Sequence, residues 1–331
     1  MKRSTVGWIL LMTMITPHLG AANKKEAVKA VETSTPQKSS GKYYIDIWTR
    51  HKGDHFSAKV PRQGAIAVEM NGMTFNEVTH HDIQYNKELT FRGLPLSDVV
   101  RLYKPWVRGM DLLILHFKNG MVLPVGRDDL LKKGEIFLAL EFKNAAGQWV
   151  TEFPKAQVPG TAPEEKQFIT FAGNKLVASR KWLQAMEQEG KHQQFNPWRH
   201  FDSLVGIEIV DPAAYYNQFR LASDKKDSYF GRLVYIDRCQ FCHAVGGVGA
   251  RYGTDFLKPQ PVSKRKNAAA LFAHVASHET KKDTKIRMPH QPDFTEKEAR
   301  DLWQWLEAAG RGALSSYEPF YRPDFKEPPH P

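Results

Sequence analysis

The residues best suited to chemistry are the two cysteines of this 331-residue chain, which stand together in the stretch Cys239-Gln-Phe-Cys242-His243. Their spacing places both thiols on nearly one face of a helical turn. Three chemistries use such a pair: two thioether bonds to a haem whose iron the histidine binds, a redox-active dithiol, and half of a zinc site. The surroundings of the motif decide among them.

Two of these interpretations need features that the sequence does not offer. A structural zinc site takes a second pair of Cys or His at matching spacing, and the chain has no third cysteine. A thioredoxin-like dithiol takes a βαβ setting, whereas the residues around the motif have helical periodicity. We therefore favour covalent haem attachment through Cys239 and Cys242, with His243 on the iron, and keep dithiol and zinc as alternatives.

A second iron ligand is expected downstream of the motif. Met288 precedes Pro289, whose ring stiffens the loop that carries the thioether. A thioether opposite an imidazole is the usual ligation of electron-transfer haems and raises their reduction potential. We therefore predict Met288 as the axial ligand opposite His243. The rival donors are three histidines in the same region: His274, His278 and His290.

Two predicted helices flank the motif. The apolar pattern favours an amphipathic helix over 228–237 and another over 296–309. Thr295 and Glu298 form the spacing of a capping box at the start of the second helix. A small haem domain needs its first and last helices packed together to close the pocket. The residues expected at their crossing are Gly231, Tyr235 and Trp305.

Taken together, the segment 231–309 resembles class I c-type cytochromes. The resemblance implies an all-α domain over 228–310 that carries one covalent haem c on Cys239 and Cys242. It also implies His243 and Met288 as the axial iron ligands. Many of these cytochromes have a Gly-Pro pair whose backbone orients the proximal histidine, but Tyr252-Gly253 stands there in this chain. The partner of the histidine is therefore an open point.

The region upstream, 42–221, mixes strand and helix signals and predicts an α+β domain. Its clearest hairpin is a buried strand over 112–117, the turn Asn119-Gly120 and a strand over 121–125. Further strands are expected over 88–92, 137–142 and 206–210.

This region resembles the molybdopterin-binding fold of sulfite oxidases. The residues that carry the resemblance are Phe91-Arg-Gly-Leu-Pro-Leu-Ser-Asp98, Val122-Leu-Pro-Val125 with Asp128-Asp129-Leu130, Phe137-Leu-Ala-Leu-Glu141, and a closing part with Pro197-Trp198 and Val205-Gly-Ile-Glu-Ile-Val210. Enzymes of that fold bind molybdenum through a cysteine, and both cysteines here belong to the haem motif. We therefore expect a cofactor-free relative that docks a partner, with no catalytic residues assigned, because fold resemblance alone does not confer activity.

The first residues have the pattern of an export signal. Lys2 and Arg3 precede an apolar run over 6–15, and small residues at 20–22 suit cleavage. The apolar run is about half of what a membrane span needs, and no other stretch is long enough. The sequence thus predicts a signal peptide over 1–22, a flexible leader over 23–41, an extended tail over 311–331 and a soluble, periplasmic protein.

The net charge is +11, or about +9 without Lys2 and Arg3, and such an excess favours acidic partners. The basic residues are spread along the chain, so nucleic acid is not an expected partner. The sequence therefore predicts an exported monohaem cytochrome that transfers single electrons between redox partner proteins. The alternative is a haem-containing subunit, or fused form, of a periplasmic molybdopterin-type oxidoreductase.

Overall fold

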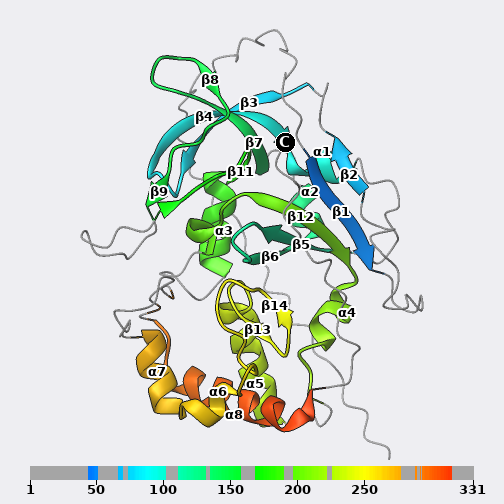
Figure 1. The fold of residues 1–331 in the computed structure, drawn as a ribbon, viewed down its shortest axis with the longest axis vertical. Helices are drawn as coiled ribbons and strands as arrows, with labels where there is room; N and C mark the ends of the chain where they lie inside the picture. The colour runs from blue at the N-terminus through cyan, green and yellow to red at the C-terminus, as the bar shows by residue number, and fades with distance from the viewer. Residues whose placement is uncertain are drawn as a thin grey trace, which may run out of the picture. The chain divides into compact units, whose positions relative to one another are not determined.

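The fold is α+β, with the sheets formed mainly by residues before 211 and the helices gathered mainly after it (Figure 1). The computed structural model describes residues 44–50, 66–69, 74–101, 111–131, 135–157, 168–189, 197–221, 226–276, 288, 291 and 293–314. All of these belong to one folded unit. The predicted signal peptide, the leader and residues 315–331 of the tail lie outside the described residues. No helix in the described part is long and apolar enough to cross a membrane.

The first sheet has five strands in the order β2-β1-β12-β5-β6. Strands β1 and β12 are parallel, and the other neighbours are antiparallel. The strands are β2 (Ile66–Glu69), β1 (Tyr44–Arg50), β12 (Leu204–Val210), β5 (Leu112–Phe117) and β6 (Val122–Gly126). The predicted strands over 112–117 and 206–210 and the turn at Asn119-Gly120 are confirmed.

Side chains on the two faces of this sheet pack into different hydrophobic cores. Leu113 and Leu115 of β5 point into the core of the α+β region. Their neighbours Leu112 and Ile114 join the core that contains Tyr235 and the other buried side chains of the helical part. Alternation along a strand sends successive side chains to opposite faces. The continuous apolar run of β5 is thus explained by burial on both faces.

The second sheet has the order β11-β7-β4-β3, with β8 paired to β7. It is antiparallel throughout, and its register shifts between Arg92 and Gly93. A Cβ atom on Gly93 would lie 2.1 Å from the carbonyl oxygen of Leu138, so only glycine allows this close pairing. The strands are β3 (Asn76–Asp82), β4 (Lys87–Pro95), β7 (Ile136–Lys143), β8 (Trp149–Val150) and β11 (Lys175–Ala178).

Short elements complete the α+β region and connect it to the helical part. They are the paired strands β9 (Ala156–Gln157) and β10 (Phe168–Ile169), the helices α1 (Leu96–Arg101), α2 (Arg127–Leu131), α3 (Arg180–Glu189) and α4 (Pro212–Asn217), and a 3₁₀ turn at Pro197–His200. Asp211 caps α4 by accepting a hydrogen bond from the Ala214 N–H, and Pro212 occupies the first turn.

The helical part is built around α5 (Lys226–Val234) and α8 (Glu296–Ala308). Helix α5 continues into a π-helical turn over Tyr235–Cys239, and α8 into a turn over Ala309–Ala313. The predicted capping box of Thr295 and Glu298 is present with both of its hydrogen bonds. The remaining elements are α6 (Val262–Arg265), α7 (Ala268–Ala276), β13 (Ala244–Val245) and β14 (Val248–Gly249).

The expected close crossing of the two main helices is confirmed. A Cβ atom on Gly231 would lie 2.1 Å from the Asp301 carbonyl oxygen and 2.5 Å from Trp305 Cβ, so the backbones approach more closely than any other residue allows. The rings of Tyr235 and Trp305 stack with centroids 5.2 Å apart. Both aromatic side chains are fully buried.

Two features differ from the sequence-based prediction of an all-α region over 228–310. Strands β13 and β14 form a small hairpin, because Gly246 (φ +64°) and Gly247 (φ +93°) adopt the left-handed conformations of a tight two-residue turn. The first helix also ends in a π-helical turn, where the Gln240 N–H donates to the Tyr235 carbonyl. The start of the tail pairs with the end of the α+β region, through a bridge between Leu314 and Leu221.

The helix crossing predicts an unusual response to Gly231→Ala. In an open helix this change stabilises by about 1 kcal/mol, but here the new methyl group meets the α8 backbone. We expect a loss of about 1–3 kcal/mol in the free energy of unfolding, measured by urea denaturation. Gly126→Ala is the control, because its Cβ would meet only the Asp129 carboxylate at 3.4 Å. Equal stabilities for the two variants would contradict the crossing.

Candidate cofactor site around the two cysteines

The two cysteines lie where the first main helix ends. Cys239 is the last residue of the π-helical turn, and its carbonyl accepts hydrogen bonds from the N–H groups of Cys242 (3.1 Å) and His243 (2.9 Å). Both thiols are free and buried. The motif is therefore one tight turn that presents two thiols and an imidazole together.

This setting argues against a redox-active dithiol. Reactive thiolates are stabilised at helix N-termini or beside cations, whereas these cysteines follow the C-terminal end of a helix, whose dipole disfavours negative charge. Burial raises the pKa of Cys239 to about 12 and raises the pKa of Cys242 as well. Both groups are therefore protonated thiols at neutral pH. A thiol in this state is a poor nucleophile for disulfide exchange.

The imidazole of His243 is held in one tautomer. Its Nδ1 lies 2.8 Å from the carbonyl oxygen of Thr254, and a carbonyl only accepts hydrogen bonds, so Nδ1 carries the proton. The Nε2 lone pair is then the one available to a metal. Burial lowers the pKa of His243, an effect that the Thr254 hydrogen bond opposes and the charge of His274 strengthens. The ring is thus neutral at neutral pH, as a metal ligand must be.

The partner of this histidine was the open point of the sequence, and the structure resolves it. Thr254 supplies the carbonyl, and Gly253 gives the ring its space. A Cβ atom on Gly253 would lie 2.4 Å from His243 Cε1 and 2.6 Å from Nδ1. The ring also stacks on Phe256, with centroids 4.6 Å apart and planes 17° apart. Tyr252-Gly253 therefore leads directly into the residue that orients the imidazole.

The loop that follows the motif is held by side chains rather than by regular structure. The Asp255 carboxylate accepts hydrogen bonds from the N–H groups of Gly246 (3.0 Å), Gly247 (2.6 Å) and Leu257 (2.8 Å). The Tyr235 hydroxyl donates to the His243 carbonyl at 2.9 Å. These contacts fix the backbone on both sides of the imidazole.

The cysteine turn also contacts the edge of the first sheet, a contact that the sequence analysis missed. The Val122 N–H donates to the Phe241 carbonyl at 3.0 Å, and the Arg251 N–H donates to the Gly120 carbonyl at 2.7 Å. Cys242 joins the core of the α+β region, whereas Cys239 joins the core of the helical part. In the sequence, the Asn119-Gly120 turn was the one signal that pointed to this contact. In the structure, Gly120 adopts φ +89°, and the backbone of Arg251 lies against it.

The predicted second ligand lies against the same core as the first cysteine. Met288 is half-buried and packs on the helical core that contains Cys239. Of its rivals, His274 lies on α7, close enough for its charge to influence His243, whereas His278 and His290 lie outside the described residues. Among the described residues, no group of three or more His, Cys, Asp and Glu side chains could hold a metal ion. The zinc interpretation therefore gains no support from this part of the chain.

The residues present fit a covalently bound haem. Two protonated, buried thiols stand beside an imidazole whose Nε2 lone pair is available. The thioether of Met288 belongs to the same apolar surroundings. Buried side chains from α7, α8 and the segment before α8 belong to the same apolar core as Cys239: Leu271, Val275, Phe294 and Leu302. The two thiols can anchor a haem, and the imidazole of His243 can bind its iron.

A buried carboxyl group lies close to this site on the α+β side. Burial raises the pKa of Asp202 to about 7, although backbone N–H groups of Asn119 and Lys118 and the Lys118 charge lower it. Its Oδ1 atom has no hydrogen-bond partner among the described residues. Burial also raises the pKa of Tyr252 to about 12, and the charges of Cys242 and Asp202 add to this. Asp202 is thus near enough to Tyr252, in the loop that follows the cysteine turn, to act on it electrostatically.

Comparisons with known proteins do not identify the chain: no protein-family model matches it, and a search of the curated proteins finds no relative.

Asp202 predicts a specific dependence of stability on pH. Its folded pKa, about 7, lies above the ordinary value of 3.8, so between these values the folded state binds the additional proton. Stability is lost as pH rises through this window, by up to about 1.4 kcal/mol per pH unit. We expect Asp202→Asn to be more stable than wild type at pH 8, by a margin that shrinks toward pH 4, in urea denaturation. Asp128→Asn is the control, because Asp128 is exposed on α2. A pH-independent margin for Asp202→Asn would refute the assignment.

Proposed function

We propose that the chain is an exported electron-transfer protein that carries one covalent haem c. Cys239 and Cys242 form its thioether bonds, and His243 and Met288 are its axial ligands. The observation that carries this proposal is the Thr254 hydrogen bond to His243 Nδ1, which leaves a neutral Nε2 beside two buried free thiols. The resemblance to class I c-type cytochromes over 231–309 points the same way.

Each residue of the site has a distinct role in this proposal. When bound, the haem supplies an iron that changes oxidation state by one electron. The two thioether bonds keep it in place, and Thr254 and Gly253 hold His243 in the required orientation. The thioether of Met288 favours reduced iron and so raises the potential, and burial in an apolar pocket tunes it further.

We also propose a role for the α+β region. Its contacts with Phe241 and Arg251 support a function in holding the cysteine turn and docking a redox partner, without a cofactor of its own. The alternative, a molybdopterin-type oxidoreductase of the sulfite oxidase kind, lacks a thiolate for molybdenum, because both cysteines stand in the haem motif. Molybdenum and pterin analysis of the purified protein separates the two: either component present at one per chain would favour the alternative.

Covalent haem is the first prediction of this proposal. Protein matured in a bacterial periplasm should give a pyridine haemochrome spectrum of c type and retain its haem after acid-acetone extraction. Cys239→Ala and Cys242→Ala should each leave one thioether and shift the haemochrome band, because one vinyl group stays unsaturated. Mass spectrometry of the peptide bearing both cysteines is the direct measurement. A colourless extracted protein with no added mass would refute the proposal.

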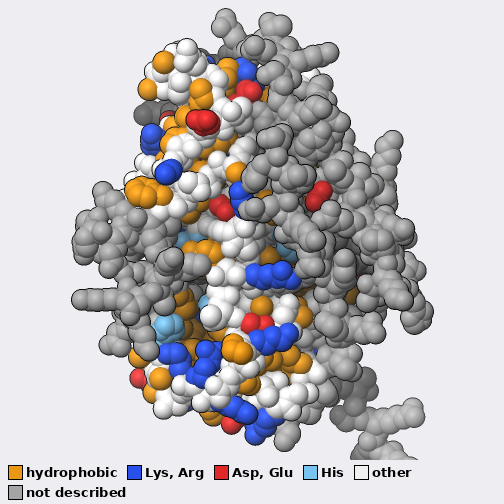
Figure 2. Space-filling view, in the orientation of Figure 1, with side chains coloured by type: hydrophobic (Ala, Val, Ile, Leu, Met, Phe, Trp, Pro, Cys, Tyr) orange, Lys and Arg blue, Asp and Glu red, His pale blue; other side chains and the backbone are white. Residues whose placement is uncertain are grey.

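The charge of the surface predicts a dependence of electron transfer on salt. Figure 2 shows Lys and Arg side chains on the visible face of the helical part, with fewer acidic ones among them. Three exposed cations lie after the Thr254 and Asp255 contacts of the loop that follows His243: Lys258, Lys264 and Arg265. This arrangement favours an acidic partner, and the attraction is screened as ionic strength rises.

We therefore expect the rate of oxidation by ferricyanide, an anionic oxidant, to fall with added salt. The rate with a cationic cobalt complex should rise instead. Lys264→Glu should slow the ferricyanide reaction about twofold or more at low salt, measured by stopped-flow spectroscopy. Lys87→Glu is the matched control, because Lys87 is exposed on β4 of the second sheet. Equal effects of the two substitutions would exclude docking near the loop that follows His243.

A further inference from the structure

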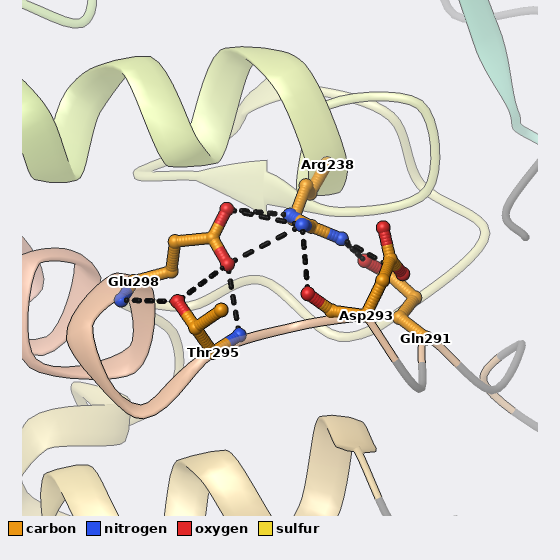
Figure 3. A network of polar contacts seen from close by, with 5 residues as sticks. All are labelled: Arg238, Gln291, Asp293, Thr295 and Glu298. Atoms are coloured by element: carbon orange, nitrogen blue, oxygen red, sulfur yellow. Dashed lines mark hydrogen bonds and ion pairs between the residues drawn. The ribbon is translucent and has the colours of Figure 1, made fainter. Parts of the chain in front are cut away.

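The arginine directly before the first cysteine is almost completely buried. Arg238 has 3% of its side chain exposed and lies in the π-helical turn that ends at Cys239. A buried guanidinium is costly unless several acceptors surround it. Figure 3 shows that the acceptors come from a segment far along the chain, Gln291 to Glu298.

The guanidinium group has acceptors on three of these residues. Its Nε and Nη2 donate to Glu298 Oε1 at 3.1 and 3.0 Å, and Nη2 also reaches Oε2 at 3.3 Å. Its Nη1 donates to Gln291 Oε1 at 3.3 Å and Asp293 Oδ1 at 3.4 Å, and Nη2 to the Asp293 carbonyl at 3.4 Å. The guanidinium carbon lies 5.4 Å from the ring centroid of Phe294. One side chain thus joins the haem-bearing turn to a continuous stretch of chain.

This stretch is anchored at both ends. Glu298 also accepts from the Thr295 N–H and hydroxyl, so the carboxylate that pairs with Arg238 also caps α8. The Gln291 N–H donates to the Val275 carbonyl at the end of α7, and Gln291 has 2% exposure. Arg238 therefore connects the cysteine turn, the start of α8 and the end of α7.

Met288 is only three residues before Gln291. A fully extended chain spans about 3.3–3.6 Å per residue, so the position of Gln291 confines the backbone of Met288 to within about 11 Å. The ring of Pro289 restricts the connection further. Fixing Gln291 therefore limits how far the thioether can move from the core on which it packs.

We propose that Arg238 is a positioning residue that holds Met288 against the haem by fixing Gln291 and Asp293. This inference rests on the proposed function. It gives Arg238 an effect on Met288, the second iron ligand, without contact between Arg238 and the cofactor. The donor geometry requires arginine, because a lysine ammonium cannot reach Glu298, Gln291 and Asp293 from one planar group.

The test compares Arg238→Gln, Arg238→Lys and Gln291→Leu in the haem-loaded protein. Imidazole competes with Met288 for ferric iron, so its apparent affinity reports how firmly the thioether is held. We expect Arg238→Gln to weaken the near-infrared methionine-to-iron band and raise imidazole affinity about tenfold or more, since hydrogen bonds to a charged group are lost. Arg238→Lys should lie between this variant and wild type. Gln291→Leu should raise the affinity as well while retaining the Arg238–Glu298 pair.

The control is Arg300→Gln, because Arg300 is exposed on α8 and pairs only loosely with Glu296, at 3.7 Å. Its imidazole affinity should stay within about twofold of wild type. If Arg238→Gln does not mature, Gln291→Leu alone decides the matter. Wild-type band and imidazole affinity in Arg238→Gln, or in Gln291→Leu where only that variant matures, would overturn the positioning role. Absence of covalent haem in the wild type would instead overturn the proposed function, and the pyridine haemochrome test made on the same samples distinguishes the two.

Discussion

Two main-chain hydrogen bonds join the cysteine turn and the loop after it to the β5–β6 hairpin of the first sheet, and they hold the turn against that sheet. They connect Phe241 to Val122 and Arg251 to Gly120. Strand β6 is the edge of that sheet, and an edge has N–H and C=O groups that need partners. The cysteine turn supplies one such partner, through Phe241, and its two cysteines enter different hydrophobic cores. The α+β region is thus part of the wall around the candidate site.

The electrostatics of the turn follow from this burial. Removal from water keeps both thiols protonated and the imidazole neutral. Because this part of the chain is buried, the charged side chain of Arg238 needs a full set of hydrogen-bond acceptors. Arg238 obtains them from Gln291, Asp293 and Glu298. A polar network of this kind in an apolar setting favours one arrangement of the segments that it joins.

The proposed function requires rigid surroundings on both sides of the turn. Electron transfer requires a haem whose position and ligands change little between oxidation states, and rigid surroundings serve that need. On the helical side, the close approach at Gly231 and the stacked rings of Tyr235 and Trp305 leave little freedom. On the α+β side, the hairpin of β5 and β6 fixes Phe241. Asp202, with its raised pKa, lies beside the Asn119-Gly120 turn of that hairpin and changes charge near neutral pH.

The sequence by itself determined the local features of this protein. The motif at Cys239, the capping box at Thr295, the buried run of β5 and the glycine at the helix crossing depend on neighbouring residues or on periodicity, and these patterns are readable without coordinates. The bounds of the two main helices differ from the predicted ones by a few residues, and the π-helical turn at Tyr235 was not predicted, because no hydrophobic period distinguishes such a turn from the end of an α-helix. Only the tertiary structure could pair Thr254 with His243 and the Asn119-Gly120 turn with Arg251, or surround Arg238 with acceptors more than fifty residues away. Such contacts form between segments that are far apart in the sequence, and residue spacing alone does not show which of these segments meet.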